Sequence, residues 1–112
     1  MDIKPGDVVL CEFYFSDFQK SKRRPVVVLK DNLPFDDFVG IPISSKIEKL
    51  NSDESLLESS DIREGTLPKT SKVMVRKTFV ISKAVVQKKY GELTESRFEQ
   101  LHGDFCRYFG CC

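Results

Sequence analysis

The sequence predicts a mainly β protein of the α+β class, built as a small, bent antiparallel sheet or barrel with an amphipathic helix at its C-terminus. Many short stretches rich in β-branched and aromatic residues alternate with turn residues, which is typical of strands. Apolar residues recur at spacings of three and four only near the end of the chain. A length of 112 residues, without repeats or low-complexity linkers, predicts one domain over residues 1–112.

The first half of the chain predicts three strands. Residues 8–15 follow a Pro-Gly turn and alternate with period two, so that Cys11 falls on the face expected to join the core. Residues 26–29 form a continuous apolar run after Pro25, which is typical of a strand buried on both faces. Residues 36–44 predict a third strand, in which Pro42 indicates an edge or a bulge.

The second half predicts further strands and the helix. Residues 54–62 are ambiguous, whereas residues 71–82 and 84–93 predict a fifth and a sixth strand, the last ending near Gly91. The helix begins after the N-cap Thr94, with Arg97 where a capping box has glutamate. Its apolar face is expected to pack on the sheet and comprises Phe98, Leu101, Phe105 and Phe109. The first three of these are expected in the core or in a dimer interface.

The composition argues against a secreted, membrane or metal-binding protein. No run approaches the roughly 20 apolar residues needed to span a bilayer, and the N-terminus lacks the parts of a secretory signal, so we expect a cytoplasmic location and no membrane partner. The cysteines at 11, 106, 111 and 112 have no CxxC spacing and predict reduced thiols. His102 and Cys106 alone make a weak ligand pair, so we expect a structural histidine and no metal.

The net charge of +1 conceals two charged blocks. Residues 65–91 carry seven lysines and arginines and no acidic residue, whereas residues 51–64 carry five carboxylates and one arginine. If the blocks fold onto different surfaces, they give one basic and one acidic face. The alternative is that the strands carry lysines on their solvated side.

The stretch KSKRRPVVVLK places Arg24 directly before Pro25, which restricts the backbone where the second strand is expected to begin. A loop over residues 16–23 would deliver this arginine to the end of the sheet, where its guanidinium is a ready fork for phosphate. The third predicted strand ends in Ser44, Ser45 and Lys46. If the second and third strands are antiparallel neighbours, Arg24 and Ser44 face the same pocket.

The usual catalytic motifs are absent from the sequence: there is no GxSxG, P-loop, GxGxxG or HExxH. A pocket with an arginine and a hydroxyl can still act on RNA, because the 2′-hydroxyl of RNA is its own nucleophile and needs positioning and charge stabilisation. Loop aromatics and cations also suit single-stranded RNA. These residues equally allow a non-catalytic barrel that binds nucleic acid or peptide.

The order of several motifs resembles the PemK/MazF family of type II toxin-antitoxin toxins, over roughly residues 5–102. The motifs are GDVVLCEFYFSD, KSKRRPVVVL, GIPISS, DIREGTLPKTSKVMVRKTFVIS and GELTESRFEQL. The resemblance implies an SH3-like barrel with a terminal helix, a homodimer, and a metal-independent endoribonuclease without cofactor that cuts single-stranded RNA and leaves a cyclic phosphate. It also implies a cognate antitoxin, whose acidic or amphipathic segment would occupy the basic groove.

The resemblance assigns the family's catalytic arginine to Arg24 and its hydroxyl, often a threonine, to Ser44. Some members have a glutamate and a glutamine in the preceding loop and a histidine before the arginine, and this chain departs from that pattern, which leaves the proton-transfer partner open. Arg24 pairing with Glu12 or Asp17, and Ser44 capping a turn, are the structural alternatives. The residues expected to contact RNA are Asp17, Gln19, Lys22, Arg23, Ser45, Lys46 and Lys77.

Two other functions compete with RNA cleavage. The related CcdB toxins share the fold and inhibit DNA gyrase through their C-terminal residues, and this chain ends in Tyr-Phe-Gly-Cys-Cys. A plain nucleic-acid-binding barrel would bind RNA with a steep salt dependence and release no products. The Arg-Pro and Pro-x-Ser elements favour the endoribonuclease, whose cleavage sequence would depend on the loops at 16–23 and 45–54.

Overall fold

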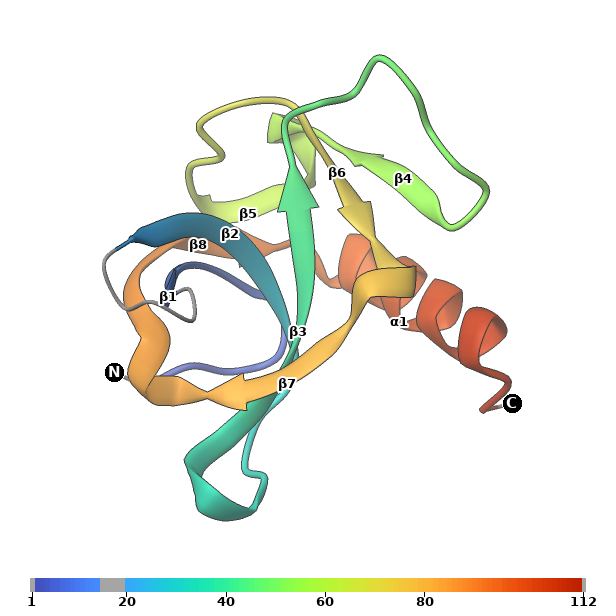
Figure 1. The fold of residues 1–112 in the computed structure, drawn as a ribbon. Helices are drawn as coiled ribbons and strands as arrows, with labels where there is room; N and C mark the ends of the chain where they lie inside the picture. Colours follow the sequence, from blue (N-terminus) through green and yellow to red (C-terminus); the bar gives the residue numbers. More distant parts are fainter. Residues whose placement is uncertain (1, 15–19, 112) are drawn as a thin grey trace.

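The computed structural model describes residues 2–14 and 20–111 of the chain. Within these residues, eight strands form one curled antiparallel sheet in the order β4-β6-β3-β2-β1-β8-β5, and β7 pairs with β3 beside this path (Figure 1). The predicted fold class, a bent barrel-like sheet with one C-terminal helix, is confirmed. The elements are β1 (Asp7–Tyr14), β2 (Ser21–Lys30), β3 (Asp37–Ser44), β4 (Glu54–Leu57), β5 (Ile62–Gly65), β6 (Ser71–Met74), β7 (Phe79–Ser82), β8 (Val86–Leu93) and α1 (Glu95–Phe109).

The curled sheet has a hydrophobic core on each face. Successive residues of a strand point to opposite faces, so Val27 joins the main core under α1 while Val26 and Val28 join the second core. The apolar run at 26–29 is therefore buried on both faces, as predicted. Cys11 also lies in the second core, and burial raises the pKa of its thiol from 9.0 to about 11, which keeps it protonated and unreactive.

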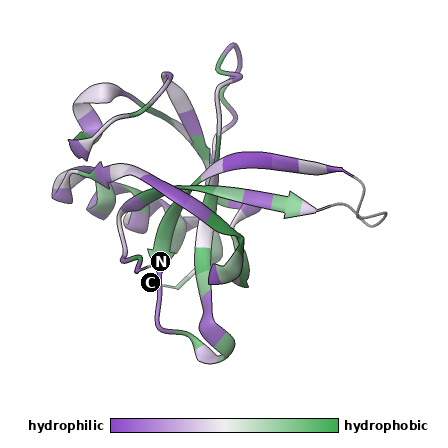
Figure 2. Ribbon diagram, turned by 90° about the vertical axis from the view of Figure 1, so that its left-hand side faces the viewer, coloured by the Kyte–Doolittle hydropathy of each residue, from purple (hydrophilic) through white to green (hydrophobic). Residues whose placement is uncertain are grey.

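The strand β2 begins earlier than the sequence predicted. Its hydrogen-bonded pairing with β1 continues outward from Pro25 to Ser21, so the expected loop up to residue 23 is partly strand. Arg24 therefore lies inside β2, opposite Cys11, and not at its first position. The shared end of β1 and β2 projects beyond the body of the protein, and the projecting part of β2 is hydrophilic (Figure 2).

The predicted edge or bulge at Pro42 corresponds to a change of partner along one side of β3. Residues 37–40 pair with β7, whereas Ile43 and Ser44 pair with β6. Proline has no backbone N–H to donate to a ladder, and Pro42 lies in the gap between these two partners. The strand expected at 71–82 is correspondingly divided into two. A 3-10 turn at Val75–Lys77 separates β6, which pairs with the end of β3, from β7, which pairs with the first half of β3.

The ambiguous segment at 54–62 contains β4 and leads into β5, which pairs with β8 as far as Gly65 opposite Gly91. The strand predicted at 84–93 begins as a 3-10 turn at Lys83–Val85 and continues as β8 to Leu93, two residues past Gly91. A side chain at Gly65, whose φ is +88°, would collide with backbone of β8. Glycine is therefore what lets these two strands approach.

The helix α1 follows its predicted N-cap, since the Thr94 hydroxyl accepts a hydrogen bond from the Arg97 N–H at 3.2 Å. Leu101 is fully buried, and Phe98 and Phe105 pack against the main core. Phe109 does not pack on the sheet as expected: it remains 49% exposed, because the end of α1 extends past the strands (Figure 1). No helix among the described residues is long and apolar enough to cross a membrane.

Two ion pairs join the two charged blocks. Antiparallel pairing of β4 with β6 brings them side by side. Lys72 Nζ lies 2.9 Å from a carboxylate oxygen of Glu54, and Arg76 Nε lies 3.9 Å from one of Asp53. Hydrogen bonds from Asn51 and then Lys72 lower the pKa of Glu54. Lys83 and Lys89 also pair with carboxylates, which belong to other parts of the chain. Four of the seven cations of the basic block are therefore paired within the described part of the chain, and a basic face made by the whole block is not what the structure shows.

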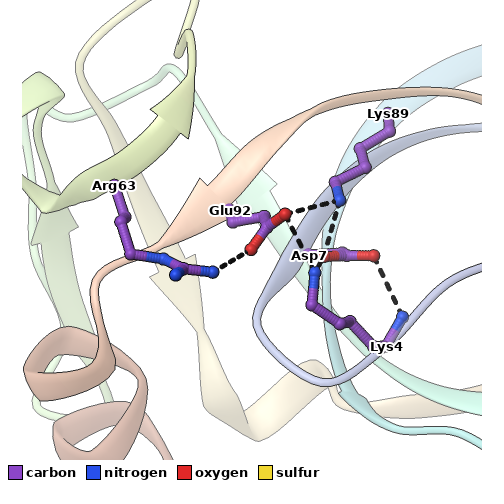
Figure 3. A network of polar contacts seen from close by, with 5 residues as sticks. All are labelled: Lys4, Asp7, Arg63, Lys89 and Glu92. Carbon is purple, nitrogen blue, oxygen red and sulfur yellow. Dashed lines mark hydrogen bonds and ion pairs between the residues drawn. The ribbon is translucent and has the colours of Figure 1, made fainter.

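A network of charges joins the N-terminal turn to β5 and β8 (Figure 3). The Asp7 carboxylate is 1% exposed and accepts the backbone N–H of Lys4 at 3.0 Å, with Lys89 Nζ at 3.2 Å. Glu92 accepts hydrogen bonds from Lys89 Nζ at 2.8 Å, from Lys4 Nζ at 2.9 Å, and from Arg63. Hydrogen bonds from Lys89, Lys4 and Arg63 hold the pKa of Glu92 at about 2, well below its ordinary 4.5.

This network predicts an acid-sensitive contribution to stability. Because the folded pKa of Glu92 is lowered, its contribution is complete above pH 4.5 and is lost as the pH falls towards 2. Urea unfolding at several pH values should show wild type losing stability over this range more steeply than Glu92→Gln. Equal slopes for the two proteins would show that the carboxylate contributes nothing to acid sensitivity.

Candidate functional site

The sheet opens into a pocket of about 450 Å³ at the end of β2 and β3. Arg24 and Ser44 both line it, so the structure brings together the two residues that the sequence placed in one pocket. The register explains this: Val26 lies opposite Pro42 in the antiparallel pair, and Arg24 and Ser44 each lie two residues beyond that pair, at the same end of the two strands. The complete lining is Leu10, Arg23, Arg24, Pro25, Ile43, Ser44, Ser45, Lys46, Leu67, Pro68, Lys69, Ser71 and Tyr90.

The Arg24 side chain is exposed and has no hydrogen bond or ion pair within residues 2–14 and 20–111. The alternative in which Glu12 pairs with Arg24 is wrong, because Glu12 pairs with Arg23 instead. Asp17, the other suggested partner, lies outside the described residues. Pairing with β1 and the rigid Pro25 fix the backbone of Arg24, while its guanidinium is left available for an anion.

The Glu12 carboxylate accepts hydrogen bonds from three neighbouring side chains. It accepts the Tyr14 hydroxyl at 3.0 Å, Arg23 Nε at 3.1 Å and the Ser21 hydroxyl at 3.2 Å. The hydrogen bonds from Tyr14 and then Arg23 lower the pKa of Glu12, and the same contact raises the pKa of Tyr14. Glu12 therefore holds Arg23 in place at the pocket and is a poor proton acceptor itself.

Ser44 closes the turn that follows β3. Its Oγ accepts the backbone N–H of Lys46 at 3.1 Å, so the turn-capping alternative describes a real contact. This contact uses a lone pair of the oxygen and leaves the hydroxyl proton free to donate to a ligand. Ser45 and Lys46 are exposed beside it and line the same pocket.

Arg24 also lines a second, shallower pocket of about 350 Å³ on the other face of β2. Phe13 and Phe79 meet edge to face in its wall, with ring centroids 5.7 Å apart, and Pro42 completes the apolar surface. Lys22 lines this second pocket and not the first. Arg24 thus lies where the two pockets meet.

Of the remaining sequence candidates, the structure describes only Lys77, which lies outside both pockets. Lys77 is exposed in the 3-10 turn after β6 and lines neither pocket. Asp17 and Gln19 lie outside the described residues. Sequence reasoning did not select Leu67, Lys69 or Tyr90, which the fold brings to the first pocket from β8 and from the turn before β6.

The first pocket is suited to an anion. Its described lining contains the cations Arg23, Arg24, Lys46 and Lys69 and no acidic side chain. Converging cations without carboxylates attract phosphate and stabilise negative charge that develops on it. Within the described part of the chain, no three histidine, cysteine, aspartate or glutamate side chains are arranged to hold a metal ion.

Comparison with solved structures shows a shared fold. The chain is similar to the MazE-MazF structure (Form-II) from Deinococcus radiodurans, with 16% identity over 98% of this chain and 97% of that one and a TM-score of 0.78. An endoribonuclease in complex with its cognate antitoxin from a Mycobacterial species gives 15% identity, 97% and 96% coverage and a TM-score of 0.75. The Mycobacterium tuberculosis toxin MazF-mt6 gives 19% identity over 91% of this chain and 96% of that one, with a TM-score of 0.65.

No curated protein matches the chain significantly by sequence. The model of one protein family, described as the PemK-like, MazF-like toxin of type II toxin-antitoxin systems, matches residues 4–109. That match covers both pockets and nearly the whole chain, and it agrees with the order of motifs in the sequence. The chain belongs to the PemK-like, MazF-like toxin family of type II toxin-antitoxin systems.

Proposed function

We propose that this toxin is a sequence-selective endoribonuclease that cleaves single-stranded RNA without a metal ion, with Arg24 and Ser44 as its catalytic residues. The observation that carries the proposal is the arginine itself: the backbone of Arg24 is fixed by strand pairing, and its side chain has no partner among the described residues. Arg24 and Ser44 line one pocket whose described lining contains no acidic side chain. The similar fold of an endoribonuclease bound to its antitoxin supports the same conclusion.

In the proposed reaction, the 2′-oxygen of one nucleotide forms a bond to the adjacent phosphorus while the bond from phosphorus to the 5′-oxygen breaks. The 2′-hydroxyl loses its proton, the departing 5′-oxygen gains one, and the products are a 2′,3′-cyclic phosphate and a 5′-hydroxyl. Arg24 stabilises the charge on the non-bridging oxygens, and the Ser44 hydroxyl donates a hydrogen bond to them. No carboxylate or histidine among the described lining residues is placed to accept the proton.

The proposal includes two protein partners. A cognate antitoxin with an acidic segment would compete with RNA for the cations of the first pocket, as charge complementarity favours. Toxin-antitoxin complexes are among the structures of similar fold. The second partner is another copy of the chain, with which it would form a homodimer. The RNA backbone would be contacted by residues that line the two pockets beside Arg24, namely Lys22, Arg23, Ser45 and Lys46.

The direct test incubates the purified protein with unstructured RNA, with and without EDTA. We expect discrete fragments that carry a cyclic phosphate and a 5′-hydroxyl, formed at the same rate in both reactions. Intact RNA, or cleavage only with added metal, would contradict the proposal. Salt-dependent binding without products would instead indicate a plain nucleic-acid-binding barrel, and inhibition of gyrase supercoiling without RNA cleavage would indicate a CcdB-like inhibitor.

A further inference from the structure

One wall of the first pocket comes from parts of the chain that the proposed reaction does not use. The turn between β5 and β6 contributes Leu67 and Lys69, and β8 contributes Tyr90. Leu67 and Tyr90 are half-buried and pack against the main core, while Lys69 is exposed. This wall therefore combines an apolar and aromatic surface with the cation Lys69, and Lys88 Nζ lies over the Tyr90 ring, 5.1 Å from its centroid.

The wall is held rigidly at both ends of the turn. The Thr66 N–H donates to the Tyr90 carbonyl at 3.0 Å, and the left-handed Gly65 permits that approach, because a side chain there would lie 2.2 Å from the same oxygen. At the other end, the buried Ser71 donates from its hydroxyl to the Lys69 carbonyl at 2.9 Å. A wall fixed in this way is preorganised for a ligand.

The chemistry of the wall fits a nucleobase better than a peptide. A planar base can cover an aromatic ring and a leucine while its phosphate meets the cations around Arg24. An acidic peptide would use the cations but leave Leu67 and Tyr90 uncovered. The pocket volume of about 450 Å³ is in the range that holds a small ligand such as one nucleotide.

We propose that Tyr90, Leu67 and Lys69 bind the base of the nucleotide next to the phosphate at Arg24, and that Tyr90 and Lys69 determine which base is preferred there. This inference rests on the proposed function for the position of the phosphate. It places base selection on the turn at 66–70 and on β8, in addition to the loops at 16–23 and 45–54 that the sequence suggested.

The first experiment measures binding without cleavage. The ligand is an RNA oligonucleotide in which fluorine replaces every 2′-hydroxyl, so that no nucleophile is present. We expect Tyr90→Leu and Lys69→Gln each to weaken binding by about tenfold, and the Tyr90 ring resonances of the wild type to shift on titration. Circular dichroism confirms folding, and Tyr108→Leu and Lys30→Gln, which change exposed residues away from the pocket, should bind as wild type does.

The second experiment compares kcat/KM for RNAs that differ only in the base on either side of the cleaved bond. Tyr90→Leu should reduce the ratio of best to worst base by about tenfold at one of these positions. A lower rate with an unchanged ratio would show only a structural role and would overturn the proposal. Two other results would also overturn it: a Tyr90→Leu protein that binds the fluorinated RNA as tightly as wild type does, or a glutamate-rich peptide whose binding Tyr90→Leu weakens as much as it weakens the binding of RNA.

Failure of this inference and failure of the proposed function give different results. If wild type leaves RNA intact but binds the fluorinated RNA through Tyr90, cleavage is disproved and the base pocket stands. If wild type cleaves RNA and Tyr90→Leu retains both affinity and base preference, the base pocket is disproved and cleavage stands.

Discussion

Replacing Arg24 with alanine is expected to slow RNA cleavage by about a hundredfold or more at saturating substrate. The side chain is the one cation of the site that lines both pockets and has no partner among the described residues. Removing a preorganised donor to the transition-state charge typically has an effect of this size. Because the same side chain is exposed and unpaired there, the free energy of unfolding should change by less than about 0.5 kcal/mol.

Two further variants separate chemistry from binding. Arg24→Lys keeps the charge but loses the planar fork, so it should recover only part of the rate. Arg23→Ala removes a neighbouring guanidinium that Glu12 already holds, and its main effect should be a higher KM. Measurements of kcat and KM with one defined RNA distinguish an effect on the chemical step from an effect on RNA binding. An Arg24→Ala protein that cleaves as fast as wild type would remove the basis of the proposed mechanism.

Local sequence patterns predicted the part of the fold that depends on local chemistry. Period-two alternation located β1, a continuous apolar run located the buried part of β2, and an N-cap with a three-and-four repeat located α1. The pairing of Arg24 with Ser44 in one pocket followed from one assumption, that the second and third strands are antiparallel neighbours. In an antiparallel pair the start of one strand lies beside the end of the other, so the start of β2 meets the end of β3.

Features that depend on distant partners could not be predicted in this way. The division of residues 71–82 into β6 and β7 reflects different pairing along β3, which no local pattern records. Tyr90 belongs to β8, which is distant in sequence from β2 and β3 and comes to the pocket through its pairing with β1. The acidic and the basic block are likewise distinct in the sequence but adjacent in the fold, because β4 of the acidic block pairs with β6 of the basic block.

Replacing Arg97 with alanine is expected to lower the free energy of unfolding by about 3 kcal/mol. The sequence marked this residue only as an unusual capping position, but its side chain is 5% exposed and ties α1 to the sheet. Arg97 Nη2 donates to the Ser55 hydroxyl at 2.8 Å and the Leu56 carbonyl at 2.9 Å, and Nε lies 3.6 Å from Asp61. Alanine would leave these acceptors without their donor. Urea unfolding measures the loss.

The matched control is Arg107→Ala on the same helix, where an exposed arginine pairs with Asp104 one turn earlier, and its effect should stay below about 0.5 kcal/mol. Arg97→Met should lower the free energy of unfolding less than Arg97→Ala does, because the methionine side chain fills the space that alanine leaves empty. It also removes Nη1 of Arg97, which is buried without a partner among the described residues. Equal stability of the Arg97→Ala and Arg107→Ala proteins would contradict the anchoring role. Since β4 pairs with β6, and β6 with Ile43 and Ser44, loss of the anchor should also lower the temperature at which cleavage fails.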